Sequence, residues 1–397
     1  MDALGLNFAV DALRQSCAGL YELDVRRCEY SRHVTLQGCA GTGVSYMGSA
    51  LLLSHFGKGG SGWAIRWAAA RTFDDILGVE TRYVGAEGGG SINPLGLLSS
   101  DGELESMEGI LVEWLYALCG DDEPRAQSVE GFKERELVGV ALKSAWKGNP
   151  GRVGMEAVLC ELARTGDQGR ALAKRIKDVT KDVHPSAFEG RCSVDPEERY
   201  VSFVPRCSND ANLAGETAVA KTLLALHAVS IFLADRAVEK MLLVDENAML
   251  GKDGSRLLLH CMRFARSMGC AFVAGGHPIA PLAEHASEIE ACLLECSRTR
   301  LFLGMTAESW CAWQQQLPVL QELHPRWDGS CNRRLQGAEV VWVQNGAAVC
   351  MQVGTSPILQ VLLGSDYSVW KAYSAARAEG VGAIEAAALV QAGGEGE

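Results

Sequence analysis

The sequence predicts an α/β fold with a mainly parallel, doubly wound sheet. Short apolar strands alternate with helical segments along most of the chain. A glycine-rich turn stands between a strand at 33–37 and an apolar helix at 46–56. A second buried strand, 241–244, ends in the acidic pair Asp245-Glu246. In open parallel sheets the carboxyl ends of the strands form the edge where ligands bind, so both features are expected at one edge.

Composition narrows the class of protein. The 397 residues suffice for one large domain with an insertion or for two domains, and 48% of them are hydrophobic, so a sizeable core is expected. The formal net charge of −12 disfavours a nucleic-acid coat over the whole surface. No apolar run reaches the roughly 18–20 residues that cross a bilayer, and we predict no transmembrane segment. The longest candidate, 218–234, carries Lys221 and His227 and fits a buried helix better.

Two further patterns concern the cellular compartment. Met1–Leu20 lacks the basic start and long apolar core of a signal peptide. The fourteen cysteines form no C-x-x-C pair, and Cys292 and Cys296, one helical turn apart, have no His or Cys cluster nearby. The sequence therefore favours reduced, mostly buried thiols in a cytosolic protein over zinc or disulfides.

The chain divides into three predicted parts. Residues 1–102 form the first part of the α/β core. Residues 103–198 change to a helical apolar period and predict an all-helical insertion. Residues 199–397 return to alternating strands and helices, and complete the core with a β-hairpin around Asn345-Gly346 and two terminal helices.

The remaining elements are expected as follows. Glycines at 57–62 predict a turn, and 72–78 a short helix. Further strands are predicted at 63–70, 81–84, 199–204, 270–274, 300–304, 338–343 and 347–353. Helices are predicted at 209–239, 255–268, 366–378 and 383–391.

Gly38–Ser45 has the frame of a phosphate-binding loop, G-x-x-x-x-G-K-[ST], with one change: Val44 stands where the lysine belongs. A glycine-rich turn before a helix aims backbone N–H groups at an anion, and the helix dipole adds to the attraction. The candidate nucleotide-binding residues in this loop are Gly38, Gly41, Thr42, Gly43, Val44 and Ser45. A turn without a ligand is the alternative.

Asp245 and Glu246 complete the pattern of a nucleotide site. An acid at the end of a buried strand holds Mg²⁺ together with the loop hydroxyl, here Ser45, and the next acid orients the attacking water. We therefore assign Ser45 and Asp245 as candidate metal ligands and Glu246 as a candidate catalytic residue. A structural ion pair is the alternative role for the two acids.

Three more residues are candidates. Arg263 and Arg266 are three apart on a predicted helix and share a face, which suits either surface salt bridges or contacts with a neighbouring subunit. His277 follows the strand at 270–274 and Gly275-Gly276. It is a candidate phosphate sensor, with an ordinary loop histidine as the alternative.

Taken together, these motifs resemble the C-terminal ATPase domain of the TraC-type conjugal-transfer ATPases of type IV secretion systems. These are hexameric P-loop proteins related to FtsK and HerA. The resemblance rests on the loop, the Ile92-Asn93-Pro94-Leu95 turn, the helical insertion, Leu243-Val244-Asp245-Glu246, the helix with the two arginines, and the closing hairpin with its helices.

The resemblance implies a RecA-like P-loop fold that binds ATP and Mg²⁺. It also implies a homo-hexamer at the cytoplasmic face of the bacterial inner membrane, in contact with type IV secretion components and, indirectly, with DNA. Arg263 or Arg266 would then act on the nucleotide of the neighbouring subunit, and His277 would stand in the γ-phosphate sensor position.

The chain departs from the family pattern at Val44, at Gly276-His277 in place of Thr-Gln, and at Asn247 after the acidic pair. Three functions stay open: an ATP-driven secretion motor, a pseudo-ATPase with a structural or regulatory role, and a HerA-like DNA translocase. The acidic pair favours the motor, and Val44 and His277 favour the pseudo-ATPase. A basic residue elsewhere, such as Lys58, Arg66 or Arg71, is a candidate substitute for the lysine.

Overall fold

A computed structural model of the chain describes most of its residues. The described residues are 32–39, 41–57, 59–67, 81–120, 128–148, 151–207, 213–234, 239–276, 296–297, 299–323, 338–344, 346–353, 361 and 367–394. Every structural statement below concerns these residues. His277, Lys58 and Arg71, and the helix predicted at 72–78, lie outside them.

The described strands form one nine-stranded sheet in the order β3-β4-β2-β5-β6-β1-β7-β8-β9. The strands from β3 to β7 are parallel, and β8 and β9 join the edge as an antiparallel hairpin. Their bounds are β1 Val34–Gln37, β2 Ser61–Ile65, β3 Arg82–Val84, β4 Tyr200–Pro205, β5 Lys240–Val244, β6 Ala271–Gly276, β7 Thr299–Phe302, β8 Ala338–Gln344 and β9 Ala347–Val353. The predicted mainly parallel sheet and the closing hairpin are confirmed.

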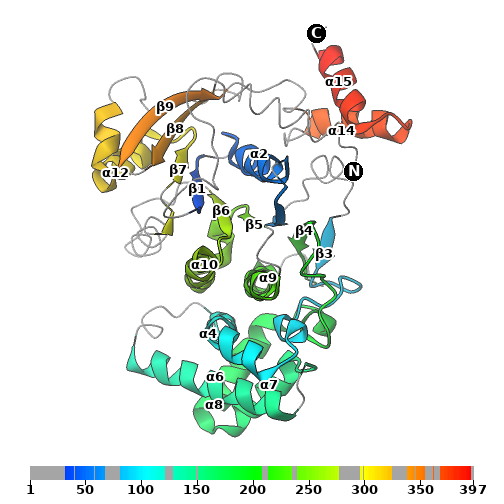
Figure 1. Cartoon of the computed structure of the whole chain (residues 1–397), viewed down its shortest axis with the longest axis vertical. Helices are drawn as coiled ribbons and strands as arrows, with labels where there is room; N and C mark the ends of the chain where they lie inside the picture. Colours follow the sequence, from blue (N-terminus) through cyan, green and yellow to red (C-terminus); the bar gives the residue numbers. More distant parts are fainter. Residues whose placement is uncertain are drawn as a thin grey trace.

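Helices cover both faces of the sheet (Figure 1). On one face lies α2 (Val44–Gly57), with α14 (Tyr367–Ala378) and α15 (Ala383–Gly394) beyond it. On the other face lie α9 (Leu213–Leu233) and α10 (Gly251–Ser267). Because successive strand residues point to opposite faces, the central strands β2, β4, β5 and β6 each contribute to two apolar clusters, one on the α2 side and one on the α9–α10 side.

The predicted helical insertion packs beneath α9 and α10 (Figure 1). It consists of α4 (Asp101–Ala117), α6 (Val129–Gly148), α7 (Met155–Arg164) and α8 (Asp167–Thr180). The 3₁₀ turns η2 (Pro94–Leu97) and η3 (Pro185–Phe188) lie before and after these helices. A single apolar cluster runs from the sheet through α9 and α10 into all four insertion helices, so the insertion shares its core with the α/β part.

Asn93, in the predicted turn, is fully buried and connects the start of the insertion to two of its later loops. Its side-chain oxygen accepts from the Leu95 amide at 3.1 Å, and its Nδ2 donates to the carbonyls of Val153 and Gly190 at 2.8 and 3.0 Å. A buried polar side chain is tolerated where such partners satisfy it. Asn93 therefore fastens the entry of the insertion to the loop between α6 and α7 and to the segment after η3.

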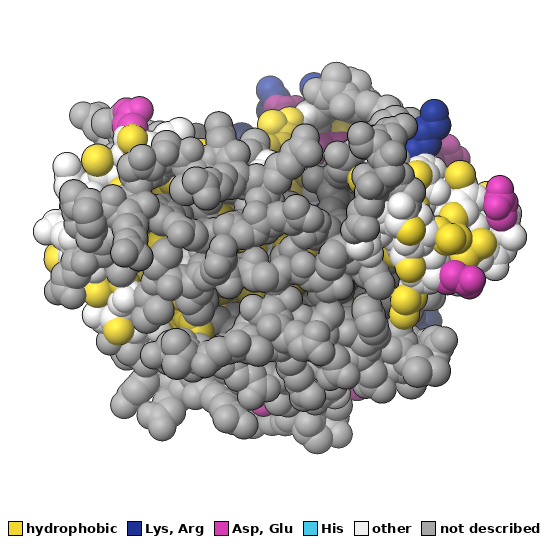
Figure 2. Space-filling view, turned by 90° about the horizontal axis from the view of Figure 1, so that it is seen from above, with side chains coloured by type: hydrophobic (Ala, Val, Ile, Leu, Met, Phe, Trp, Pro, Cys, Tyr) yellow, Lys and Arg dark blue, Asp and Glu magenta, His cyan; other side chains and the backbone are white. Residues whose placement is uncertain are grey.

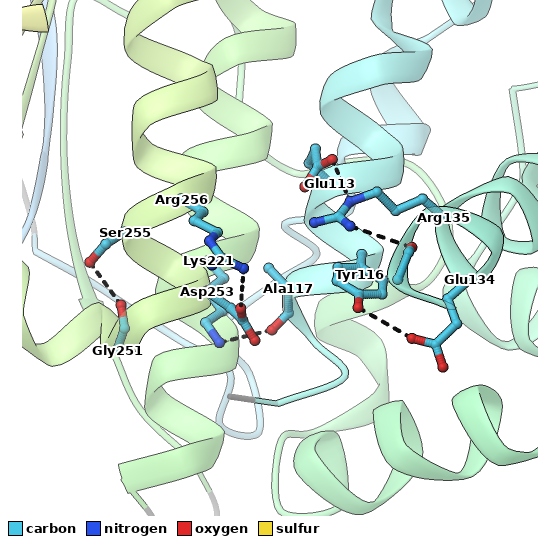
Figure 3. A network of polar contacts seen from close by, with 11 residues as sticks. Glu113, Tyr116, Ala117, Glu134, Arg135, Lys221, Gly251, Asp253, Ser255 and Arg256 are labelled. Atoms are coloured by element: carbon cyan, nitrogen blue, oxygen red, sulfur yellow. Dashed lines mark hydrogen bonds and ion pairs between the residues drawn. The ribbon is translucent and has the colours of Figure 1, made fainter. Parts of the chain in front are cut away.

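A buried polar network joins the insertion to α9 and α10 (Figure 3). Lys221 of α9 is 4% exposed and donates to the carbonyl of Ala117, at the C-terminus of α4, at 2.8 Å. A cation at this end of a helix is favoured by the helix dipole. Next to it, Trp114 Nε1 donates to Thr222 Oγ1 at 3.0 Å. These contacts fix α4 against α9.

Several predicted bounds are wrong. β2 covers Ser61–Ile65, so Gly62 is inside a strand and not in a turn; a Cβ there would lie 2.6 Å from the Met241 carbonyl oxygen, and only glycine permits this spacing. The strand also ends before Arg66, five residues earlier than predicted. α9 ends at Leu233, before the predicted end at 239, whereas α10 starts four residues earlier than predicted, directly after the 3₁₀ turn η4 (Asn247–Leu250).

The neighbouring elements α12 (Ala307–Gln316) and η5 (Pro318–Leu323) had no predicted counterpart either. They form a small apolar cluster with β7 and β8, in which Phe302 packs edge-to-face on Trp310 and Trp313. Trp310 and Trp313, each 4% exposed, therefore serve as core anchors of this cluster.

Among the described residues one helix, α9, is long and apolar enough to cross a membrane, and 78% of its most apolar window is buried inside the molecule. Hydrophobic side chains are also exposed at the end of the molecule that carries α14 and α15 (Figure 2), where Leu389 is 54% exposed.

Candidate nucleotide site

The glycine-rich loop connects β1 to the first turn of α2. Gly41 and Gly43 have φ of 76° and 97°, a left-handed conformation that glycine adopts without strain. The Thr42 amide and hydroxyl both donate to the Cys39 carbonyl, at 3.1 and 2.7 Å. These bonds turn the chain over the start of α2, and the N-terminal amides of a helix are the groups that can hold an anion.

Neighbouring strands hold this loop in place from both sides. The Gly38 amide donates to the Gly276 carbonyl at 3.3 Å, and the Cys39 amide donates to the Gly304 carbonyl at 2.8 Å. A Cβ on Gly38 would lie 2.5 Å from Thr42 Oγ1, so the close turn requires glycine. The loop is therefore shaped by its own sequence and by β6 and the segment after β7.

β6 lies between β1 and β5 in the sheet, so one strand separates the loop from the acidic pair. β6 ends in Gly275 and Gly276, and a Cβ on Gly275 would lie 3.1 Å from Val44 Cγ1 and 3.7 Å from Asp245 Oδ1, so the glycine leaves room for both side chains in the space between the loop and the acids. Across this space Ser45 Oγ donates to Asp245 Oδ1 at 3.0 Å. Residues 200 positions apart in the sequence thus meet at the carboxyl edge of the sheet.

The pair of oxygen ligands suits magnesium. Mg²⁺ prefers oxygen ligands and usually takes one or two from the protein, with phosphates and water completing its octahedron. The Ser45 hydroxyl and Asp245 carboxylate supply such a pair beside the loop. Within the described residues no cluster of three or more His, Cys, Asp or Glu side chains suits a metal held by the protein alone.

Glu246 follows directly and has a φ of 60°, and it is the one non-glycine residue of the described chain with a positive φ. This left-handed conformation is rare for side chains other than Asn and Asp, and costs of order 1 kcal/mol or more. The Glu246 carbonyl accepts from the Met249 amide at 2.9 Å and opens η4. Strain of this kind concentrates at functional sites, in agreement with a functional role for the acid.

Val44, in the lysine position, is buried with 9% exposure. Its methyl carbons would lie 2.9 and 3.1 Å from a Cβ on Gly38 and on Gly275. The side chain therefore fills the space between the loop and β6 with apolar contacts. It adds no charge to the anion cradle.

Arg263 and Arg266 lie elsewhere in the chain. They occupy the last two turns of α10 and are exposed. They lie near the amino edge of the sheet, where the charge of Arg266 contributes to the lowered pKa of His33, next to the start of β1. His260 lies close both to Arg263 and to the Arg135–Glu113 ion pair of the insertion. Neither arginine approaches the loop of its own chain, so any contact with nucleotide requires a second subunit.

Arg66 is the residue at this edge that sequence reasoning placed wrongly. It was expected inside a strand, but it is the first residue after β2 and is 2% exposed. Its Nη1 donates to Ser49 Oγ of α2 at 3.1 Å. A charged residue after a run of buried strand positions was the available signal for a strand end.

Comparison with solved structures identifies the fold. VirB4 of Thermoanaerobacter pseudethanolicus superposes with a TM-score of 0.65 and 17% identity, over 87% of this chain and 96% of that chain. The chain has the same RecA-like α/β fold as this structure. The bacterial conjugative coupling protein TrwB superposes with a TM-score of 0.59 and 13% identity, over 87% of this chain and 92% of that chain. No protein-family model and no curated protein matches the sequence.

TrwB has been solved with the ATP analogue ADPNP and with ADP and Mg²⁺. The predicted α/β fold with a RecA-like sheet, helical insertion and C-terminal hairpin is therefore confirmed. At these levels of identity the likeness concerns the fold, and the chemistry has to be argued from the residues of this chain.

Proposed function

We propose that the chain is an ATP-binding subunit of a type IV secretion or conjugal-transfer machine, with Mg-ATP bound at Gly38–Ser45. The observation that carries the proposal is the 3.0 Å contact between Ser45 and Asp245, which joins the two halves of a nucleotide site. In this proposal the loop amides hold the phosphates, and Ser45 and Asp245 hold Mg²⁺. Glu246 orients the attacking water.

The wider setting follows from the likeness to VirB4 and TrwB, the latter a conjugative coupling protein. We place the chain in a homo-hexameric ring at the cytoplasmic face of the bacterial inner membrane, beside other secretion components. The ring powers transfer of DNA or protein or assembly of the channel. Arg263 or Arg266 acts on the neighbour's nucleotide, and His277 occupies the sensor position. The division into 1–102, 103–198 and 199–397 belongs to this proposal.

The first experiment measures ATP binding and phosphate release by the wild-type chain, E246Q and E239Q. Glu239 precedes β5 at its opposite end and pairs with Arg32, so E239Q is a matched control. We expect release by wild type and E239Q, and loss of release with retained binding in E246Q. Background release from the wild type that E246Q does not alter would exclude the motor.

A second candidate function is a pseudo-ATPase that keeps the fold and the ring contacts and serves a structural or regulatory role. The apolar packing of Val44 against Gly38 and Gly275 favours it, because the loop keeps its shape without the lysine. Native mass measurement with and without ATP separates the cases: a ring that forms identically in both conditions, together with background phosphate release, supports the pseudo-ATPase.

A further inference from the structure

We infer that Arg66 supplies the fixed positive charge of the phosphate site that Val44 does not. The inference rests on the proposed function, because it assumes that a nucleotide binds at the loop. Arg66 is proposed to act on the phosphates through space, from the end of the neighbouring strand β2.

The sheet register places Arg66 beside Asp245. β2 and β5 are parallel, with Ile65 paired to Val244, and the Asp245 amide donates to the Ile65 carbonyl at 3.0 Å. The next position on each strand is Arg66 and Asp245. Because Ile65 and Val244 both point to the α9–α10 side, the two following side chains both point to the α2 side.

Contacts with α2 connect Arg66 to the loop. Ser45 and Ser49 are four residues apart and so lie on one face of the helix. Ser45 donates to Asp245, and Ser49 accepts from Arg66. The Arg66 guanidinium therefore lies one helical turn from the hydroxyl that is proposed to hold Mg²⁺, in a polar row that starts at the loop.

Burial makes this charge effective. Arginine stays protonated in proteins, and a charge with little solvent around it acts over a longer distance than an exposed one. Three cationic side chains are buried within the described residues: Arg66, Lys221 and Lys240. Lys221 contacts the insertion, and Lys240 starts β5 at the amino edge. Of these three, Arg66 is thus the one that lies at the carboxyl edge of the sheet and on its α2 face, as the loop does.

The test compares binding of Mg-ATP, Mg-ADP and adenosine to wild type, R66Q and R66K, with thermal melts to confirm folding. R199Q is the matched control, since Arg199 contacts the same helix at its other end, where Nη2 donates to the Phe56 carbonyl at 3.1 Å. We expect R66Q to weaken ATP at least ten-fold, ADP less and adenosine not at all. R66K and R199Q should stay within about three-fold of wild type for ATP.

A double variant adds a second check. In V44K R66Q the lysine restores a cation to the site, so V44K should improve ATP affinity at least ten-fold more in the R66Q background than in wild type. Two results would overturn the inference by showing that Arg66 has a structural role. One is an equal gain in ATP affinity from V44K in the wild-type and R66Q backgrounds. The other is an equal loss of affinity for ATP and for adenosine in R66Q. Failure of wild type to bind any nucleotide would instead refute the proposed function.

If R66Q does not fold, a structure of the wild-type chain with Mg²⁺ and a non-hydrolysable ATP analogue replaces the variant. The expected result is a phosphate oxygen within about 8 Å of the Arg66 guanidinium, the range over which charges act at physiological ionic strength. A bound triphosphate with every oxygen farther away would overturn the inference.

Discussion

Replacing Val44 with lysine tests what the loop has lost. A hydrogen-bonded charged contact contributes about 1.5–3 kcal/mol. This corresponds to about one to two decades in the dissociation constant. V44K should therefore bind Mg-ATP about 10- to 100-fold more tightly than wild type, provided that Gly38–Ser45 contacts the phosphates.

The same substitution has an opposite effect on the empty protein. Val44 is 9% exposed and packs against Gly38 and Gly275, so a longer side chain must pass through a filled space. Overpacking of this kind costs about 1–3 kcal/mol. The nucleotide-free variant should melt at a lower temperature than wild type and gain more thermal stability from ATP.

Calorimetric titration and thermal melts measure both effects, with V44M as the control. Methionine is long, flexible and uncharged, so it reproduces much of the added bulk without the cation. The reasoning predicts tight binding by V44K and wild-type or weaker binding by V44M. Equal affinities for V44K and V44M would refute it, because the ammonium would then lie away from the phosphates.

Three further changes have defined outcomes. D245N should abolish the dependence of ATP binding on Mg²⁺, since an amide is a poor magnesium ligand. ATP titrations in the presence of Mg²⁺ and of EDTA measure this dependence. An unchanged dependence would show that Mg²⁺ does not bind at Asp245. Burial lowers the pKa of His33 to about 4 and that of His227 to about 3. Below pH 6.5 the unfolded chain binds a proton at each of these two histidines and the folded chain does not, so the free energy of unfolding should fall towards pH 4, by about 2 kcal/mol per histidine at pH 5. H227L should remove about half of this loss in denaturant titrations. A pH profile of H227L identical to that of the wild type would show that His227 does not cause the loss. N93A leaves two buried carbonyls and one amide without their partner and should cost about 3 kcal/mol or more in unfolding free energy; a change below 1 kcal/mol would show that Asn93 does not hold the insertion.

The loop and the acidic pair were predictable because each is a local pattern with a local cause. The glycines of Gly38–Gly43 specify a turn before an apolar helix, and the run before Asp245 specifies a buried strand. Their meeting at one edge followed from the rule that parallel strands place their carboxyl ends together. The presence of β6 between them was not predictable, because strand order depends on packing of the whole sheet.

The placement of Arg66 shows where sequence reasoning fails. The end of β2 is fixed by the neighbouring strands β4 and β5, and the sequence from 63 to 70 has no glycine or proline to mark it. Arg263 and Arg266 show a different difficulty. Their shared face was predicted correctly, but a contact across subunits depends on a partner that a single chain does not specify.

The sequence also did not predict that the insertion and the sheet share one apolar core. The apolar period of 103–198 predicts helices but not the surface on which they pack. That surface is provided by α9 and α10, and α9 is buried over nearly its whole length and on all sides. A helix that is apolar on all sides is either a membrane-spanning helix or a core helix. The two are distinguished only by what packs around the helix.

Titration calorimetry of the whole wild-type chain with ATP in the presence of Mg²⁺ tests the central claim most directly. The account predicts one saturable ATP site per chain, formed by the loop after β1 and the acids after β5. Heat of dilution alone, at protein and nucleotide concentrations well into the millimolar range, would contradict it.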